Sequence, residues 1–81
     1  MKVRVRFFSQ LRDLAGADEL DLDLPANATV SELLAVLYGR FPEIRSHDKT
    51  ILVGAGVEFV DRKYRILPGD EIAIMPPVQG G

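Results

Sequence analysis

Two short segments of this sequence alternate apolar and polar residues almost without a break, and this alternation limits the fold more than any other feature. In KVRVRFF, residues 2–8, the two valines and Phe7 lie on one side of an extended chain, whereas Phe8 lies on the charged side. In ELDLDL, residues 19–24, the leucines lie on one side and the carboxylates on the other. A period of two residues predicts strands with one buried face, so we expect the two segments to pair in a sheet.

Two helices are predicted, one short and one long. SQLRDLAG (9–16) predicts one or two helical turns, with Ser9 as the N-cap and Gly16 as the stop. The long helix is predicted to begin after Thr29, because Thr29 and Glu32 have the spacing of a capping box, and to end before Pro42. The residues of its expected apolar face are Val30, Leu33, Leu34, Leu37 and Phe41.

Apolar runs in the second half of the chain predict further strands. They are ILV (51–53), VEFV (57–60), the short YRIL (64–67) and EIAIM (71–75), with a PGD turn at 68–70. This order of elements predicts an α+β fold in which a mixed sheet packs on one main helix. The ubiquitin-like β-grasp has this order, and its last strand lies beside its first. We expect residues 1–75 to form a β-grasp domain and residues 76–81 to form a flexible, extended C-terminal tail.

The composition argues against several classes of function. The chain has 81 residues, a net charge of -2 and no cysteine. The negative charge favours neither nucleic acid nor an anionic membrane as a partner, and without cysteine there is no thiolate metal site and no nucleophilic thiol. The N-terminal segment lacks the apolar stretch of a signal peptide, and no run approaches the roughly 20 apolar residues of a membrane span. We expect a single cytoplasmic domain.

The densest run of charge is acidic and comprises Asp18, Glu19, Asp21 and Asp23. A metal site would need convergent oxygens, but the alternation places most of these carboxylates along one strand face. We expect them to pair with the lysine and the two arginines of residues 2–6 instead. His47 is expected at the surface, and Gly54 and Gly56 are expected in a strand connection. No metal site is predicted.

The last six residues, PPVQGG (76–81), directly follow the final predicted strand. Pro76 and Pro77 cannot donate to a ladder and favour an extended chain, so we expect them to direct the tail away from the sheet. Gly80 and Gly81 lack a Cβ and would fit through a narrow channel. The group presented would be the α-carboxylate of Gly81, which is a poor electrophile at neutral pH, so its chemistry would begin with activation such as adenylation.

Apolar residues opposite the core are predicted beside this tail. Phe8 on the first strand and Met75 on the last strand would be neighbours if those strands are adjacent, and Phe59 is a third candidate. A docking surface would gain about 1.5 to 3 kcal/mol from the burial of each large side chain. At this point, ordinary core positions for Phe8 and Met75 are equally open.

Three segments resemble the small, sulfur-carrying subunit of molybdopterin synthase: FFSQLRDLAG (7–16), NATVSELL (27–34) and PGDEIAIMPPVQGG (68–81). The resemblance covers nearly the whole chain. It implies that a ubiquitin-activating-type adenylyltransferase, using ATP and magnesium, adenylates Gly81, which is then converted to a thiocarboxylate. It also implies that the tail enters a pocket of the large synthase subunit, where the sulfur passes to cyclic pyranopterin monophosphate.

The resemblance further implies that this chain is a non-catalytic, sulfur-donating subunit that holds no cofactor stably, in a heterotetramer with the large subunit. Gly81 would bear the sulfur and Gly80 would thread the channel, whereas Phe8 and Met75 would pack on the partners. Arg12 matches an arginine of the family without an assigned role. The other tail residues would lie along the entry: Pro76, Pro77, Val78 and Gln79, the last in place of the smaller residue common in the family.

Alternative functions share part of this pattern. The same tail chemistry would serve a sulfur carrier for thiamine, tungsten cofactor or tRNA thiolation. A Gly-Gly ending would also suit a ubiquitin-like protein modifier, in which Gly81 is joined to a lysine amine. The remaining alternative is a non-catalytic interaction domain with an inert terminus.

Overall fold

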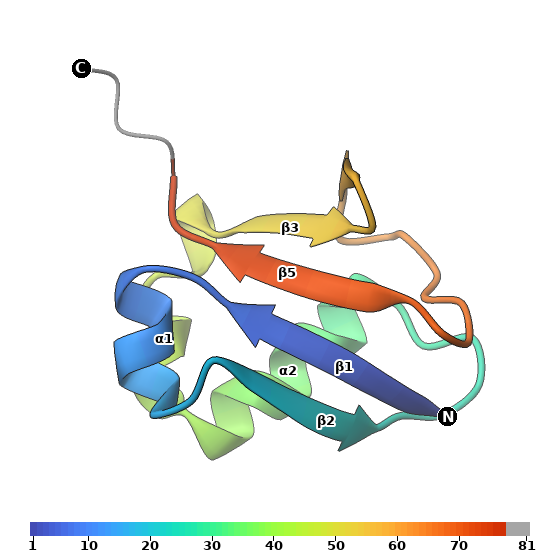
Figure 1. The fold of residues 1–81 in the computed structure, drawn as a ribbon, viewed down its shortest axis with the longest axis horizontal. Coiled ribbons are helices and arrows are strands. Elements are labelled where there is room, and N and C mark those ends of the chain that lie inside the picture. Colours follow the sequence, from blue (N-terminus) through green and yellow to red (C-terminus); the bar gives the residue numbers. More distant parts are fainter. Residues whose placement is uncertain (78–81) are drawn as a thin grey trace.

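The computed structural model describes residues 1–77 and shows a five-stranded sheet with its longest helix packed behind it (Figure 1). Among these residues, no helix is both long enough and apolar enough to cross a membrane. The elements in chain order are β1 (Lys2–Phe7), α1 (Gln10–Ala15), β2 (Glu19–Asp23), α2 (Val30–Arg40), α3 (Pro42–Arg45), the 3-10 helix η1 (Asp48–Thr50), β3 (Leu52–Ala55), β4 (Glu58–Val60) and β5 (Glu71–Met75).

The strands are arranged in the order β2-β1-β5-β3-β4. Strand β1 is antiparallel to β2 and parallel to β5, and β3 is antiparallel to both β5 and β4. The expected mixed sheet, with its last strand beside its first, is therefore confirmed. Because β1 and β5 run in the same direction, they finish at the same end of the sheet, at Phe7 and Met75. We call this end the tail end.

One face of the sheet forms the hydrophobic core with α2. Val3, Val5 and Phe7 of β1 are buried, as the alternation predicts. Leu22 of β2 is also buried, whereas Leu20 on this edge strand is half-buried. The buried residues of α2 are Val30, Leu33, Leu34, Leu37 and Tyr38. The other face of β1 stays exposed, and we call this side of the sheet the open face.

Local signals account for the start and the end of α2. The Thr29 hydroxyl accepts a hydrogen bond from the Glu32 N–H, and the Glu32 carboxylate accepts one from the Thr29 N–H, both at 3.2 Å. The predicted capping box is thus present. Pro42 ends α2 and then becomes the first residue of α3, a short helix that was not predicted. Phe41 between the two helices is half-buried and packs edge to face on Phe7.

One local prediction is confirmed in position and another is wrong. Ser9 occupies the N-cap position of α1, with a positive φ of 56° and no capping hydrogen bond through its side chain, and Gly16 ends the helix in the left-handed conformation. The YRIL segment is not a strand, because only Arg65 forms an isolated bridge, with Thr29. Ile66 alone within this segment is buried, so the segment contributes one core side chain rather than a ladder.

Candidate functional site

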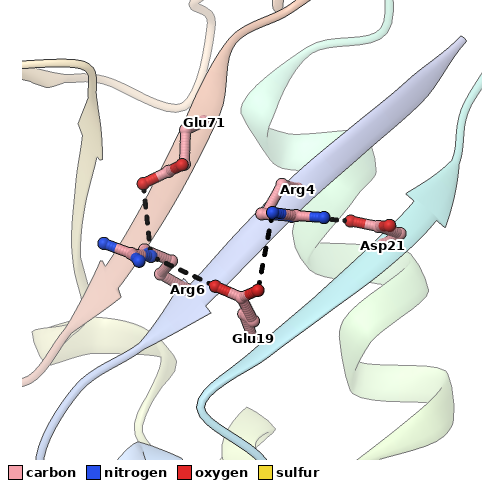
Figure 2. Close-up of polar contacts among 5 residues, drawn as sticks. All are labelled: Arg4, Arg6, Glu19, Asp21 and Glu71. Atoms are coloured by element: carbon pink, nitrogen blue, oxygen red, sulfur yellow. Dashed lines mark hydrogen bonds and ion pairs between the residues drawn. The ribbon is translucent and has the colours of Figure 1, made fainter.

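The open face is charged over β1 and β2. Arg4 Nε lies 3.0 Å from Asp21 Oδ1, and Arg6 Nε lies 3.4 Å from Glu19 Oε2 and 3.3 Å from Glu71 Oε1 (Figure 2). A further contact of 3.5 Å joins Arg4 to Glu19 and closes the network. The hydrogen bond from Arg4 lowers the pKa of Asp21. The predicted cross-strand pairing is confirmed for Arg4 and Arg6, whereas Asp18 pairs with Arg12 of α1 at 3.6 Å. Because these side chains are about half exposed, solvent screens the pairs and they contribute little to stability.

The same face is apolar over β5, β3 and β4. Phe8, Phe59 and Met75, the three predicted interface residues, line one hollow of about 260 Å³. Phe8 is 43% exposed and Phe59 is 70% exposed, while Met75 is half-buried. None of the three is among the buried core residues, so the ordinary core positions considered for Phe8 and Met75 are excluded. The structure brings these residues together, and their contact with a partner remains a prediction.

Gly54 explains why this part of the sheet is hollow. It lies within β3, opposite Phe59 on β4 and Ala73 on β5, so backbone rather than a side chain forms the floor. Its expected place in a strand connection is wrong; Gly56 alone takes that role, with a φ of 63° at the turn before β4. The turn also presents Val57, which is fully exposed at the rim of the hollow. The periodicity of a single strand did not identify Gly54 because its partners lie on two other strands.

The tail leaves the domain beside the apolar hollow. The Phe8 N–H donates to the Ile74 carbonyl at 3.2 Å, which joins the end of β1 to the end of β5. Pro76 and Pro77 follow β5 directly, are half-buried and belong to no helix or strand. The predictions for Val78, Gln79, Gly80 and Gly81 concern residues outside the described range.

The PGD turn has a structural role that sequence reasoning missed. One carboxylate oxygen of Asp70 accepts hydrogen bonds from the Tyr64 hydroxyl and the Leu67 N–H, both at 2.8 Å. The hydrogen bond to Asp70 raises the pKa of Tyr64. Gly69 has a φ of 88°, which favours glycine. Asp70 therefore holds the chain in position immediately before β5 begins.

A second polar group lies where α2, η1 and the segment after β4 meet. The Asp48 carboxylate accepts hydrogen bonds from the Tyr38 hydroxyl and from Arg62 Nη1, the latter at 2.9 Å. The hydrogen bond from Tyr38, followed by that from Arg62, lowers the pKa of Asp48. Burial, together with the hydrogen bond to Asp48, raises the pKa of Tyr38 far above its ordinary value. The adjacent hollow, of about 600 Å³, includes the half-buried His47 in its lining. Within residues 1–77, no cluster of three or more metal-ligating side chains occurs.

The profile of the ThiS family matches residues 5–81, which is almost the entire sequence. The chain belongs to the ThiS family. One relative of this chain is the molybdopterin synthase sulfur carrier subunit of Chlamydomonas reinhardtii. The two sequences are 34% identical over 83 aligned residues, which cover 100% of both chains. The predicted resemblance to sulfur-carrying subunits is therefore confirmed.

Several solved structures are similar in fold to this chain. The molybdopterin converting factor subunit 1 of Pyrococcus furiosus has a TM-score of 0.88 at 27% identity, covering 96% of this chain and 99% of its own. Small archaeal modifier protein 1 of Haloferax volcanii has a TM-score of 0.84 at 28% identity, covering 95% and 98%. A chain of the complex between subunits 1 and 2 of the molybdopterin-converting factor of Helicobacter pylori shares the fold, with a TM-score of 0.73 at 24% identity over the full length of both chains. The ubiquitin-like β-grasp fold is confirmed.

Proposed function

We propose that this chain is the sulfur carrier subunit of a molybdopterin synthase, with the α-carboxylate of Gly81 as the group that bears the sulfur. The observation that carries this proposal is the similarity to the Chlamydomonas sulfur carrier subunit over both whole chains. The family match runs through Gly81 and supports the same assignment.

The chemistry begins with activation of the carboxylate. In an adenylyltransferase, an oxygen of the Gly81 carboxylate attacks the α-phosphorus of ATP and releases pyrophosphate, because the free carboxylate is an anion that resists nucleophiles. Hydrosulfide, or a donor that delivers sulfur at the same oxidation level, then attacks the acyl carbon and displaces AMP, which leaves a thiocarboxylate. In the large subunit, this sulfur attacks a side-chain carbon of cyclic pyranopterin monophosphate and displaces an oxygen substituent from that carbon. Water then cleaves the acyl–sulfur bond of the resulting thioester, which leaves the sulfur on the pterin and returns Gly81 as a carboxylate. This chain supplies no acid or base to these steps; it presents the terminal group.

In this proposal, the apolar hollow is the surface through which the chain binds its partner proteins. Phe8 and Met75 lie beside the point where the tail leaves β5, so a protein that encloses the tail covers them too. Burial of each large side chain would contribute about 1.5 to 3 kcal/mol to the complex. We assign this surface to the large subunit and, in turn, to the adenylyltransferase, with a heterotetramer as the assembled synthase.

Protein modification is the second candidate function. The similarity to small archaeal modifier protein 1, at 28% identity and a TM-score of 0.84, favours it specifically. In this case the adenylated Gly81 would be attacked by a lysine amine of a target protein instead of by sulfur. Both candidates share the activation step and differ in the nucleophile.

Intact-mass spectrometry of the chain coexpressed with its adenylyltransferase tests the proposal. We expect a mass increase equal to the difference between sulfur and oxygen, located at Gly81 by fragmentation. Location is necessary because a sulfoxide at Met1 or Met75 adds nearly the same mass. A variant that lacks Gly81 is the control, and it should stay unmodified while retaining its circular dichroism spectrum. An unmodified Gly81 beside an active adenylyltransferase would contradict the proposal, and conjugates of higher mass on blots of the tagged chain would favour modification.

A further inference from the structure

The hollow of about 600 Å³ beside Asp48 lies at the tail end. Its lining comes from the end of α2, from α3 and from the segment through η1. The residues of η1 immediately precede β3, whose first residue, Leu52, pairs with Met75 at the end of β5. Thr50 precedes Leu52 by two residues, and Pro76, the first residue of the tail, directly follows Met75. The hollow and the start of the tail therefore lie at the same end of the sheet (Figure 1).

Two exposed cations border this hollow, together with the partly exposed carboxylate of Asp48. Arg45 and Lys49 line it and are exposed, and among residues 1–77 neither has a carboxylate oxygen within 4.0 Å. The carboxylate of the hollow, Asp48, is already engaged by Tyr38 and by Arg62, which lies 2.9 Å away. Arg4 and Arg6 of the open face and Arg12 of α1 differ, because all three have carboxylate partners.

This local charge is opposite in sign to that of the whole chain, whose net charge is -2. A partner with an acidic surface is therefore repelled by the molecule as a whole and attracted at the tail end. Such an arrangement orients two proteins as they approach, and it acts on the association rate more than on the final affinity.

We propose that the hollow bordered by Arg45 and Lys49 contacts an acidic surface of the large synthase subunit, the protein proposed to enclose the tail. This inference rests on the proposed function, because it requires a partner that encloses the tail. The apolar hollow lies on the open face and the cationic hollow lies on the side of the helices, with the root of the tail between them. A protein that surrounds the tail meets both, so the apolar contact provides affinity and the cationic contact provides orientation.

Stopped-flow association of the full chain with the large synthase subunit of the same organism tests this inference. The variant Arg45→Glu/Lys49→Glu reverses both charges, and Arg45→Gln/Lys49→Gln removes them. The control is Arg65→Glu, which reverses one charge instead of two. Arg65 is exposed, and its backbone forms a bridge with Thr29, near the start of α2 and away from the tail end. Circular dichroism checks that each variant is folded.

At an ionic strength of about 0.05 M, we expect the double charge reversal to lower the association rate constant roughly tenfold or more and the control to lower it less than about threefold. The neutral double variant should fall between these two. At about 0.5 M salt the differences should nearly vanish, since screening then acts within a few ångströms.

Equal rate constants for the double reversal and for Arg65→Glu would overturn the inference while leaving the proposed function intact. The inference would also be overturned, and the proposed function left intact, if inorganic phosphate in the millimolar range shifted the amide resonances of Arg45 and Lys49 but the double charge reversal bound the large subunit at the wild-type rate. The hollow would then bind small anions without contacting the partner. Failure of the wild-type chain to bind the large subunit at all would overturn the proposed function, and this inference with it.

Discussion

At the scale of single residues, the apolar hollow depends on a missing side chain. A Cβ at Gly54 would lie 3.3 Å from Met75 Cε and 3.7 Å from Ala73 Cβ. The end of the Met75 side chain is flexible and can move by the few tenths of an ångström required. A methyl group at this position is therefore compatible with the fold, but it occupies space that a partner side chain would use.

Gly54→Ala should weaken binding of the large subunit without loss of stability. The new methyl group would exclude about one methyl group of the partner from the hollow, which lowers the binding free energy by about 0.8 kcal/mol. This corresponds to a roughly fourfold higher Kd, which calorimetry measures. The free energy of unfolding should be unchanged or rise by up to about 1 kcal/mol, because glycine is unfavourable inside a strand.

The control for this prediction is Gly39→Ala, an exposed site in α2 where a new Cβ meets nothing within 4 Å. It should raise stability in a similar way with no change in Kd. If Gly54→Ala bound the partner as tightly as this control, the hollow would not be part of the interface.

At the scale of elements, α2 owes its position to local signals at both ends. The capping box at Thr29 and Glu32 starts it, and Pro42 redirects the chain into α3. The helix supplies much of the core on its side of the sheet, so its first turn is linked to global stability. The backbone of this first turn is also tied to the later chain, since the Val30 N–H donates to the Tyr64 carbonyl at 3.0 Å.

Thr29→Ala should lower the free energy of unfolding by about 1 kcal/mol, because the Glu32 N–H loses its acceptor. Urea denaturation measures the change. Ser31→Ala, at an exposed position in the first turn, is the matched control and should change stability by less than about 0.5 kcal/mol. A loss of the same size in both variants would show that the cap itself contributes nothing.

At the scale of the whole molecule, Asp48 joins segments that are distant in the sequence. Its side chain binds Tyr38 at the end of α2, and both its carboxylate and its carbonyl accept hydrogen bonds from Arg62, beyond β4. The pKa of Asp48 is lower in the folded protein than its ordinary value of 3.8. Its ionised form therefore stabilises the fold above about pH 4, and this contribution is lost as the pH falls further.

Asp48→Asn should flatten the acid side of the stability profile. We expect the variant to be less stable than the wild type at pH 7 and to lose less stability between pH 5 and pH 2, as measured by urea midpoints at each pH. Asp13→Asn, an exposed aspartate of α1, is the control and should retain the wild-type profile. An unchanged acid slope in Asp48→Asn would show that this carboxylate does not link folding to pH.

Much of the fold could be predicted because its signals are local. The alternation of β1 identifies Val3, Val5 and Phe7 as core residues, and the capping box identifies the start of α2, since each pattern repeats within a few residues. YRIL failed for the opposite reason. The turn there is held by Asp70, which accepts from Tyr64 and Leu67, and such side-chain bonds compete with strand pairing without leaving a periodic pattern.

The sequence by itself determined the β-grasp order of elements, the core face of β1 and the chemistry available at a Gly-Gly ending. Tertiary structure decided how those parts become surfaces. Register across β5, β3 and β4 places Gly54 beneath Phe59, and the antiparallel pairing of Leu52 with Met75 places Arg45 and Lys49 at the tail end. Periodicity reports which face a side chain occupies on its own element, whereas a surface shared by several elements depends on strand pairing that no single segment encodes.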